Sequence, residues 1–217
     1  MMKSKSYLVL LILFIVALFA AACDGNVAIN KTLRVGDGES HDGGLSSVNG
    51  NIYVGKNCVI NGECNSVNGR IKIGDHSRIE GLGSVNGSIS IGKDVHIDGE
   101  IGTVNGGVFL ENGSRVSDDI ETVNGKIELD GAVCDGDIST INGGIELTND
   151  ALVKGNILIK GSRGKSDKYN RINIRLESGS IVEGDIRVEG ENIRVTVYLS
   201  GGGKVLGRIE NAEIVEE

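Results

Sequence analysis

The chain lacks the residues on which a wide globular core usually depends. It has no proline and no tryptophan, and only seven of its 217 residues are aromatic, four tyrosines and three phenylalanines. Three of the seven, Tyr7, Phe14 and Phe19, fall in the first 22 positions. A broad core normally recruits large aromatic side chains, whereas a narrow core that repeats along an axis is filled by Val, Ile, Leu and small residues. The composition therefore favours a slender, repeating core.

The sequence is also short of positive charge. It holds 22 Lys and Arg against 30 Asp and Glu. Leaving out Lys3 and Lys5 with the first 22 residues gives 20 against 30, a net charge of −10. An acidic chain without a basic stripe and interleaved aromatics repels phosphate backbones. We therefore do not expect nucleic acid as a partner.

The first 22 residues have the pattern of a signal peptide. Lys3 and Lys5 precede an uninterrupted apolar run, 7–22, that ends in three alanines directly before Cys23. A charged start, an apolar stretch and a small-residue cleavage site occur in the order that export requires. The sequence predicts cleavage between Ala22 and Cys23.

Small residues followed by a cysteine resemble a bacterial lipobox, in which Cys23 becomes the acylated new terminus. Ala20 departs from that motif, which prefers Leu there, and two alternatives stay open: an ordinary signal peptidase cutting at the same bond, and an uncleaved anchor. Acyl chains give lasting attachment because each buried CH₂ contributes about 0.8 kcal/mol. Asp24 resembles the signal that retains some lipoproteins in the inner membrane. We expect an exported, membrane-anchored lipoprotein of the bacterial cell envelope that faces the periplasm.

A tetrapeptide, Ser or Thr, then Val or Ile, then Asn-Gly, occurs six times at intervals of 18 or 19 residues. Its asparagines are Asn49, Asn68, Asn86, Asn105, Asn124 and Asn142. Each interval contains three short runs in which apolar or small residues alternate with polar ones. The inward positions of one unit are Ile89, Ile91, Val95, Ile97, Gly99 and Ile101.

Alternation with period two predicts strands with one buried face, and three such runs per repeat predict one triangular coil. A single coil cannot bury its inward face, but stacking the next coil about 4.8 Å away pairs the backbone and closes the core. The predicted fold is therefore all-β: a single-stranded parallel β-helix, or three-sided β-solenoid.

The Asn-Gly pair marks a corner of each coil. Asn and Gly tolerate the left-handed backbone angles of a sharp bend, and stacked Asn side chains can form a hydrogen-bonded ladder along the rod. The preceding Ser and Thr residues would form a parallel row of hydroxyl groups. Alternation from Ile101 places Thr103 inward, which argues against adhesion or ice binding through that row. Repetition in every coil favours a structural role over a catalytic one.

The repeat fades after Ile159, and two degenerate coils follow a polar, Gly-rich stretch. With the six regular coils this gives eight, with Val27 to Val35 as a strand capping the first coil and acidic Glu213, Glu216 and Glu217 capping the last. The expected divisions are a signal peptide (1–22), a lipidated linker with a capping strand (23–45), six regular coils (46–160), a surface loop (161–171), and two degenerate coils with a cap (172–217).

Three cysteines other than Cys23 occupy inward positions, Cys58, Cys64 and Cys134. The last lies four coils from the others, roughly 19 Å along the axis, which is too far for a disulfide. Buried thiols are the favoured interpretation, with a bridge between Cys58 and Cys64 as the alternative.

The sequence offers no clear metal or catalytic site. Zinc enzymes built on a three-sided β-helix need converging imidazoles, but alternation turns His76 and His96 to solvent, and His41 lies outside the regular coils. No calcium-binding pattern accompanies the acidic pairs, so these are interpreted as a charged outer face. The pairs are Asp118 with Asp119 and Asp135 with Asp137.

Runs such as "SRIEGLGSVNGSISIG" and "VEGDIRVEGENI" resemble the bactofilin, or polymer-forming cytoskeletal, group, and the chain also resembles putative-adhesin β-solenoid domains. The likeness covers Ser46 to roughly Ile214. Bactofilins are cytoplasmic and have no export signal, so the resemblance implies a β-helix and the option of self-association, but no cytoskeletal role.

The expected function is a non-enzymatic envelope scaffold or interaction module without a cofactor, with the membrane, another copy, or an envelope protein or polysaccharide as partner. A carbohydrate-binding adhesin is the first alternative. A hexapeptide-repeat or polysaccharide-active enzyme is the second; it would need a cleft, and the loop Gly161 to Arg171 contains Asp167 but no His, Cys or Glu.

Overall fold

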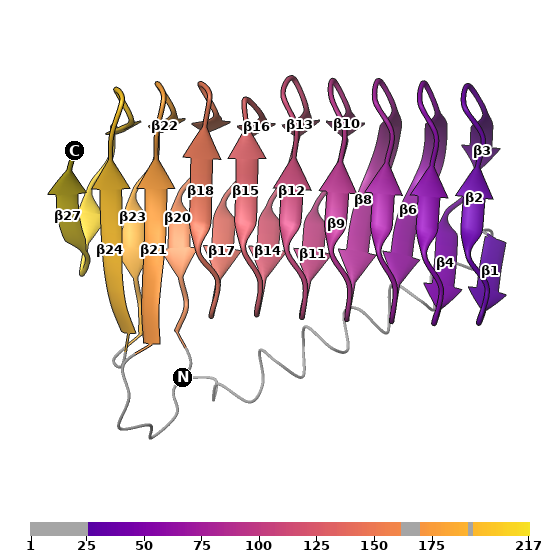
Figure 1. The fold of residues 1–217 in the computed structure, drawn as a ribbon, viewed down its shortest axis with the longest axis horizontal. Helices are drawn as coiled ribbons and strands as arrows, with labels where there is room; N and C mark the ends of the chain where they lie inside the picture. The colour runs from indigo at the N-terminus through magenta and orange to yellow at the C-terminus, as the bar shows by residue number, and fades with distance from the viewer. Residues whose placement is uncertain (1–25, 162–169, 191–192) are drawn as a thin grey trace.

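The computed structural model describes residues 26–161, 170–190 and 193–217. The predicted signal peptide, its cleavage site and Cys23 lie outside these residues. The described chain consists of strands, turns and bends without a helix, wound into a rod of about ten turns (Figure 1). Among these residues there is accordingly no helix that could cross a membrane. The predicted all-β, parallel, three-sided solenoid is confirmed.

The strands line three faces of the rod. The first face is a ten-stranded sheet made of β2 (Leu33–Val35), β5 (Ile52–Val54), β7 (Ile71–Ile73), β9 (Ile89–Ile91), β12 (Val108–Leu110), β15 (Ile127–Asp130), β18 (Ile145–Thr148), β21 (Asn170–Leu176), β24 (Ile193–Leu199) and β27 (Glu213–Glu216). These strands lie side by side across Figure 1.

The second and third faces belong to one 17-stranded sheet, because two long strands, β6 (Val59–Ser66) and β8 (Arg78–Ser84), run across both. The second face continues with β3 (Ser40–Asp42), β10 (His96–Ile97), β13 (Arg115–Val116), β16 (Val133–Cys134), β19 (Leu152–Val153), β22 (Ile181–Val182) and β25 (Lys204–Val205). The third face continues with β1 (Asn26–Ile29), β4 (Leu45–Val48), β11 (Ile101–Thr103), β14 (Ile120–Thr122), β17 (Ile138–Thr140), β20 (Ile157–Ile159), β23 (Ile186–Val188) and β26 (Ile209–Glu210).

Every pairing is parallel and joins equivalent positions of successive coils; Val108, for example, pairs with Ile89 below it and Ile127 above it. Inward residues therefore stack into continuous columns of Ile, Val and Leu, most of them fully buried. No aromatic side chain belongs to the core of the described chain. Short aliphatic side chains fill it because two inward residues from each of three short strands leave no room for rings.

The sequence predicts eight coils, and the structure has about ten turns. The additional turn is 33–48, formed by β2, β3 and β4, of which residues 33–45 were expected to belong to the linker and capping strand. It was overlooked because the corner before it reads Asn30-Lys31, without the marker glycine. The acidic tail adds a further strand, β27, which pairs with β24. Asn170 and Arg171, expected in the surface loop, already belong to β21, and residues 162–169 lie outside the described ranges.

Candidate functional site

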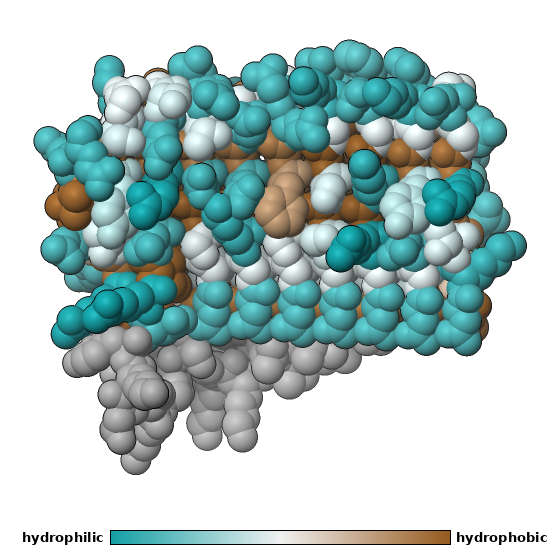
Figure 2. Space-filling model, viewed as in Figure 1, coloured by the Kyte–Doolittle hydropathy of each residue, from teal (hydrophilic) through white to brown (hydrophobic). Residues whose placement is uncertain are grey.

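A ladder of asparagine side chains runs along one corner of the rod. In each step the Nδ2 of one asparagine donates to the Oδ1 of the asparagine one coil before, at 2.6 to 2.9 Å. This corner lies at the lower edge of Figure 1, where Figure 2 shows an evenly spaced hydrophilic row. The members are Asn30, Asn49, Asn68, Asn86, Asn105, Asn124, Asn142 and Asn170.

The tetrapeptide identifies six of these eight asparagines. Asn30 and Asn170 do not match it because each is followed by a cation, Lys31 or Arg171, instead of glycine. The only local signal was the apolar residue before Asn30, which repeats the Val or Ile of the tetrapeptide. Asn170 had no such signal, since 28 residues separate it from Asn142.

The corner glycines are required for a different reason from the one expected. Among the ladder asparagines only Asn30 and Asn49 have a positive φ, at 56° and 60°, and none of the six glycines that follow a ladder asparagine does. The glycines are needed because the coils touch there: a Cβ on Gly106 would lie 2.0 Å from the carbonyl oxygen of Gly87 in the preceding coil. At the other five corners the corresponding distance is 1.8 to 2.2 Å.

The hydroxyl row of the tetrapeptide is buried and points inward. Five of its members donate to the carbonyl oxygen of the corner below, as Thr122 does to Gly106 at 3.3 Å. The Oγ1 of Thr140 is buried without a partner. These hydroxyls close the corners and are not exposed to a ligand.

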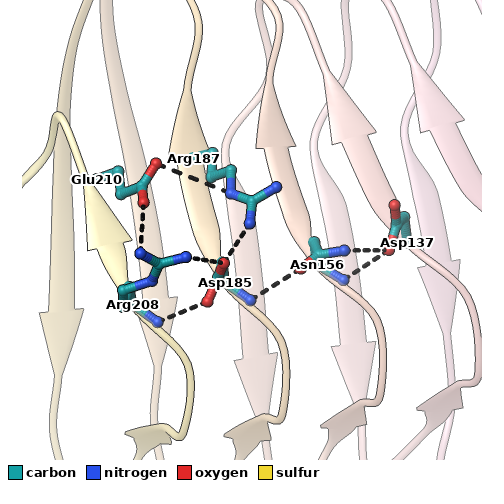
Figure 3. A network of polar contacts seen from close by, with 6 residues as sticks. All are labelled: Asp137, Asn156, Asp185, Arg187, Arg208 and Glu210. Atoms are coloured by element: carbon teal, nitrogen blue, oxygen red, sulfur yellow. Dashed lines mark hydrogen bonds and ion pairs between the residues drawn. The ribbon is translucent and has the colours of Figure 1, made fainter.

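A second ladder follows the corner between the second and third faces (Figure 3). Here a side-chain Oδ1 accepts the backbone N–H of the equivalent residue one coil later. The N–H groups of Asp137 and Asn156 donate to Asp119 and Asp137, respectively, each at 2.7 Å. The N–H of Asp185 donates to Asn156 at 3.0 Å, and that of Arg208 donates to Asp185 at 2.8 Å. Asp119 and Asp137, predicted to be part of a charged outer face, therefore also close a corner.

The ends of this second ladder differ electrostatically. Burial and the charges of neighbouring carboxylates raise the pKa of Asp119. The backbone N–H of Arg208 and the guanidinium of Arg187 lower the pKa of Asp185. Both arginines also pair with Glu210, at 3.8 Å. The acidic column thus ends in a neutralising cluster at the last coils.

The three histidines are separate. His41 Nε2 lies 2.9 Å from Asn26 Nδ2, His76 lies 3.5 Å from Asp94, and His96 lies 3.0 Å from Asp98. His41 belongs to strand β3 of a regular coil, so its expected place outside the coils was wrong. No three His, Cys, Asp or Glu side chains of the described chain form a group suited to a metal ion.

Cys58, Cys64 and Cys134 are fully buried free thiols, so the alternative bridge between the first two is not formed. Burial raises the pKa of Cys64 and of Cys134 to about 12. Cys58 Sγ lies 3.0 Å from the carbonyl oxygen of Gly36. The three residues serve as small core side chains.

The outward column of the first face was not predicted. In each of the first nine strands, the residue between the last two inward residues points outward. The register stacks these outward residues in one column: Arg34, Tyr53, Lys72, Ser90, Phe109, Glu128, Glu146, Arg175 and Tyr198. All three aromatic residues of the described chain stand in it. The Arg34 guanidinium lies 4.4 Å from the centroid of the Tyr53 ring, and that of Arg175 lies 4.3 Å from the Tyr198 centroid.

The charges of this face are segregated along the rod. The outward side chains of β2, β5, β7 and β9 include Arg34 and Lys72, and Arg70 directly precedes β7. No carboxylate of the described chain lies within 4.0 Å of the charged nitrogens of these three residues. Farther along, Lys126 pairs with Glu128 and Glu146. The outward residues on and beside β2, β5, β7 and β9 are called the cationic patch: Arg34, Asn51, Tyr53, Arg70, Lys72 and Ser90.

Comparison of the chain with models of protein families, with curated proteins and with solved structures yields no match.

Proposed function

We propose that the chain is an exported, lipid-anchored rod without catalytic activity that acts as a structural or interaction scaffold of the cell envelope. The observation that carries the proposal is the columnar repetition. The asparagines, hydroxyls and corner carboxylates are engaged in stacking one coil on the next, and none of these sets converges on a single site. The signal-like amino terminus with Cys23 supports the anchor.

The anchor is tested by the intact mass of the full chain purified from bacterial membranes. We expect a mature chain that begins at Cys23 and carries acyl groups, and we expect Cys23→Ser to leave an unacylated precursor. A wild-type chain that begins at residue 23 without acyl groups would instead favour ordinary secretion, and the anchor would have to be abandoned.

Self-association is the second part of the proposal and is supported by the open ends of the solenoid. At one end β1, β2 and β3 each pair on one side only, and β25, β26 and β27 do so at the other. Such edges accept further strands unless they are blocked. Large exposed apolar side chains occur at both ends, among them Val27 and Ile29, 59 % and 70 % exposed, and Leu206, 64 % exposed.

Sedimentation of the full chain in detergent over a range of concentrations tests this part. We expect assemblies that Ile29→Lys weakens, because a charge at an edge strand opposes pairing. The matched control is Val59→Lys, which adds the same charge at an exposed valine of β6, a strand that is paired on both sides, with β3 and with β8. A monomer at all concentrations, or equal effects of both variants, contradicts end-to-end association.

Likeness to the bactofilin and putative-adhesin groups is supported at the level of a β-helix repeat protein. Within that class the cationic patch favours one alternative, a carbohydrate-binding adhesin, because unpaired cations beside an aromatic ring are suited to a polar anionic partner. The separated histidines offer no comparable support for an enzyme.

A further inference from the structure

We propose that the cationic patch binds a linear anionic polysaccharide laid along the rod axis. The inference rests on the proposed function, since it names the partner of the scaffold. Its starting point is the isolation of three cations, Arg34, Arg70 and Lys72, on a chain whose net charge is −8. Most other cations of the described chain have carboxylate partners, for example Lys56 with Asp75 and Arg78 with Asp98.

The patch carries three positive charges and no negative charge. The outward residues of β2, β5, β7 and β9 and of the positions beside them include no Asp or Glu. The nearest acidic residues in sequence are Asp37, Asp75 and Asp94, at the next corner. Asp37 accepts the backbone N–H of Lys56 at 2.8 Å, and Asp75 accepts that of Lys93 at 3.2 Å and pairs with the Lys56 ammonium. An anion on the patch therefore meets cations and no carboxylate.

Spacing points to an extended polymer. Arg34 and Lys72 occupy the same column two coils apart, which separates them by roughly 10 Å, close to the spacing of alternate sugars in an extended chain. Tyr53 lies between them and holds the Arg34 guanidinium against its ring, which leaves the in-plane N–H donors free for a carboxylate. Ser90 continues the column with a hydroxyl group.

The composition of the patch favours a polysaccharide over a membrane surface. A surface that inserts into lipid presents large apolar side chains, and none of the large exposed apolar residues of the described chain lies on these four strands. Beyond Phe109 the face turns acidic through Glu111, Glu128 and Glu146, which limits the bound segment to roughly 15 Å.

Calorimetric titration of the full chain in nonionic detergent tests the inference, with polygalacturonate as the probe and dextran as the neutral counterpart. We expect salt-sensitive binding of polygalacturonate only. The variant Arg34→Gln, Arg70→Gln, Lys72→Gln should weaken it roughly tenfold to a hundredfold, since each exposed ion pair contributes about two- to fivefold. The charge-retaining variant Arg70→Lys, Lys72→Arg, which keeps the Arg34 guanidinium on the Tyr53 ring, should stay within about threefold of wild type.

A second triple variant, Lys154→Gln, Lys160→Gln, Lys204→Gln, removes the same charge from the other faces and should leave the dissociation constant nearly unchanged. Equal weakening by both Gln variants would show a general charge effect and overturn the assignment. If the first variant is destabilised, Lys72→Gln alone, at an exposed side chain, supports the same comparison.

Absence of polygalacturonate binding also overturns the inference. Protection of β2, β5 and β7 from hydrogen exchange by phosphatidylglycerol nanodiscs, without polysaccharide binding, would assign the patch to the membrane surface. In both cases the scaffold proposal is judged separately, by the mass and sedimentation measurements.

Discussion

The corner glycines provide a sharp test of how the coils are held together. Gly106→Ala places a Cβ 2.0 Å from the carbonyl oxygen of Gly87, whereas a Cβ on Gly102, in β11 of the preceding coil, meets no atom within 4 Å. Neither glycine has a positive φ, so backbone preference does not separate the two substitutions. The pair isolates the effect of contact between coils.

The loss of unfolding free energy in Gly106→Ala can be worked out from the movement that the added Cβ forces. The two coils have to separate locally, which strains the packing by about 1 to 3 kcal/mol. Separation also weakens the ladder bond from Asn105 to Asn86, at 2.8 Å, and the hydroxyl bond from Thr103 to Gly87, at 3.4 Å. At about 1 kcal/mol for each net hydrogen bond, the total loss is about 3 to 5 kcal/mol.

Gly102→Ala is expected to be neutral or to stabilise by about 0.5 kcal/mol, because it restricts the unfolded chain without a clash. Urea denaturation supplies the comparison, and hydrogen exchange at β11 and β14 locates the loss, since coils of a solenoid can open one at a time. If Gly106→Ala and Gly102→Ala agree within about 0.5 kcal/mol, the close approach is not what requires glycine at this corner.

Three further outcomes are expected. Thr140→Val should stabilise the fold by about 1 kcal/mol by removing an unpartnered hydroxyl, whereas Thr122→Val should destabilise it by a similar amount in urea titrations. Because the pKa of Asp119 is raised in the folded chain, its carboxylate costs stability as the pH rises through that pKa; Asp119→Asn should therefore raise the unfolding free energy by about 0.5 kcal/mol at pH 7 and not at pH 3. Cys64 and Cys134 should react with a disulfide reagent at pH 8 only after denaturation, and rapid reaction of the native chain would contradict their burial.

The fold was predictable from the sequence because the solenoid repeats its constraints in every coil. The inward alternation of Ile89 and Ile91 recurs around the rod, so a short-range pattern defines a long-range structure. The prediction was incomplete where the tetrapeptide changes. Asn30 and Asn170 belong to the ladder although no glycine follows them, because the side-chain amide alone provides the hydrogen bonds. The reason for glycine at the corners could not be predicted, because the distance between successive coils decides it.

The grouping of side chains on the outward face was harder to predict from the sequence. Arg34, Tyr53 and Lys72 are separated by 19 residues at each step, and nothing local relates them. Their proximity depends on the register between β2, β5 and β7, which the structure supplies. Pairing with carboxylates also depends on neighbours in other coils, so unpaired cations could be identified only after stacking was known.

Inward and corner residues are subject to different physical constraints from outward residues. Inward and corner residues are determined by stacking: exchanging them opens a cavity, breaks a ladder or forces coils apart. Outward residues such as Arg70 and Lys72 contribute little to stability, because exposed charges without partners gain almost no folding free energy. Mutual repulsion between these two neighbours slightly opposes the fold. Stability therefore does not explain why three unpaired cations gather on one face of an acidic rod, whereas binding of an anionic polymer does.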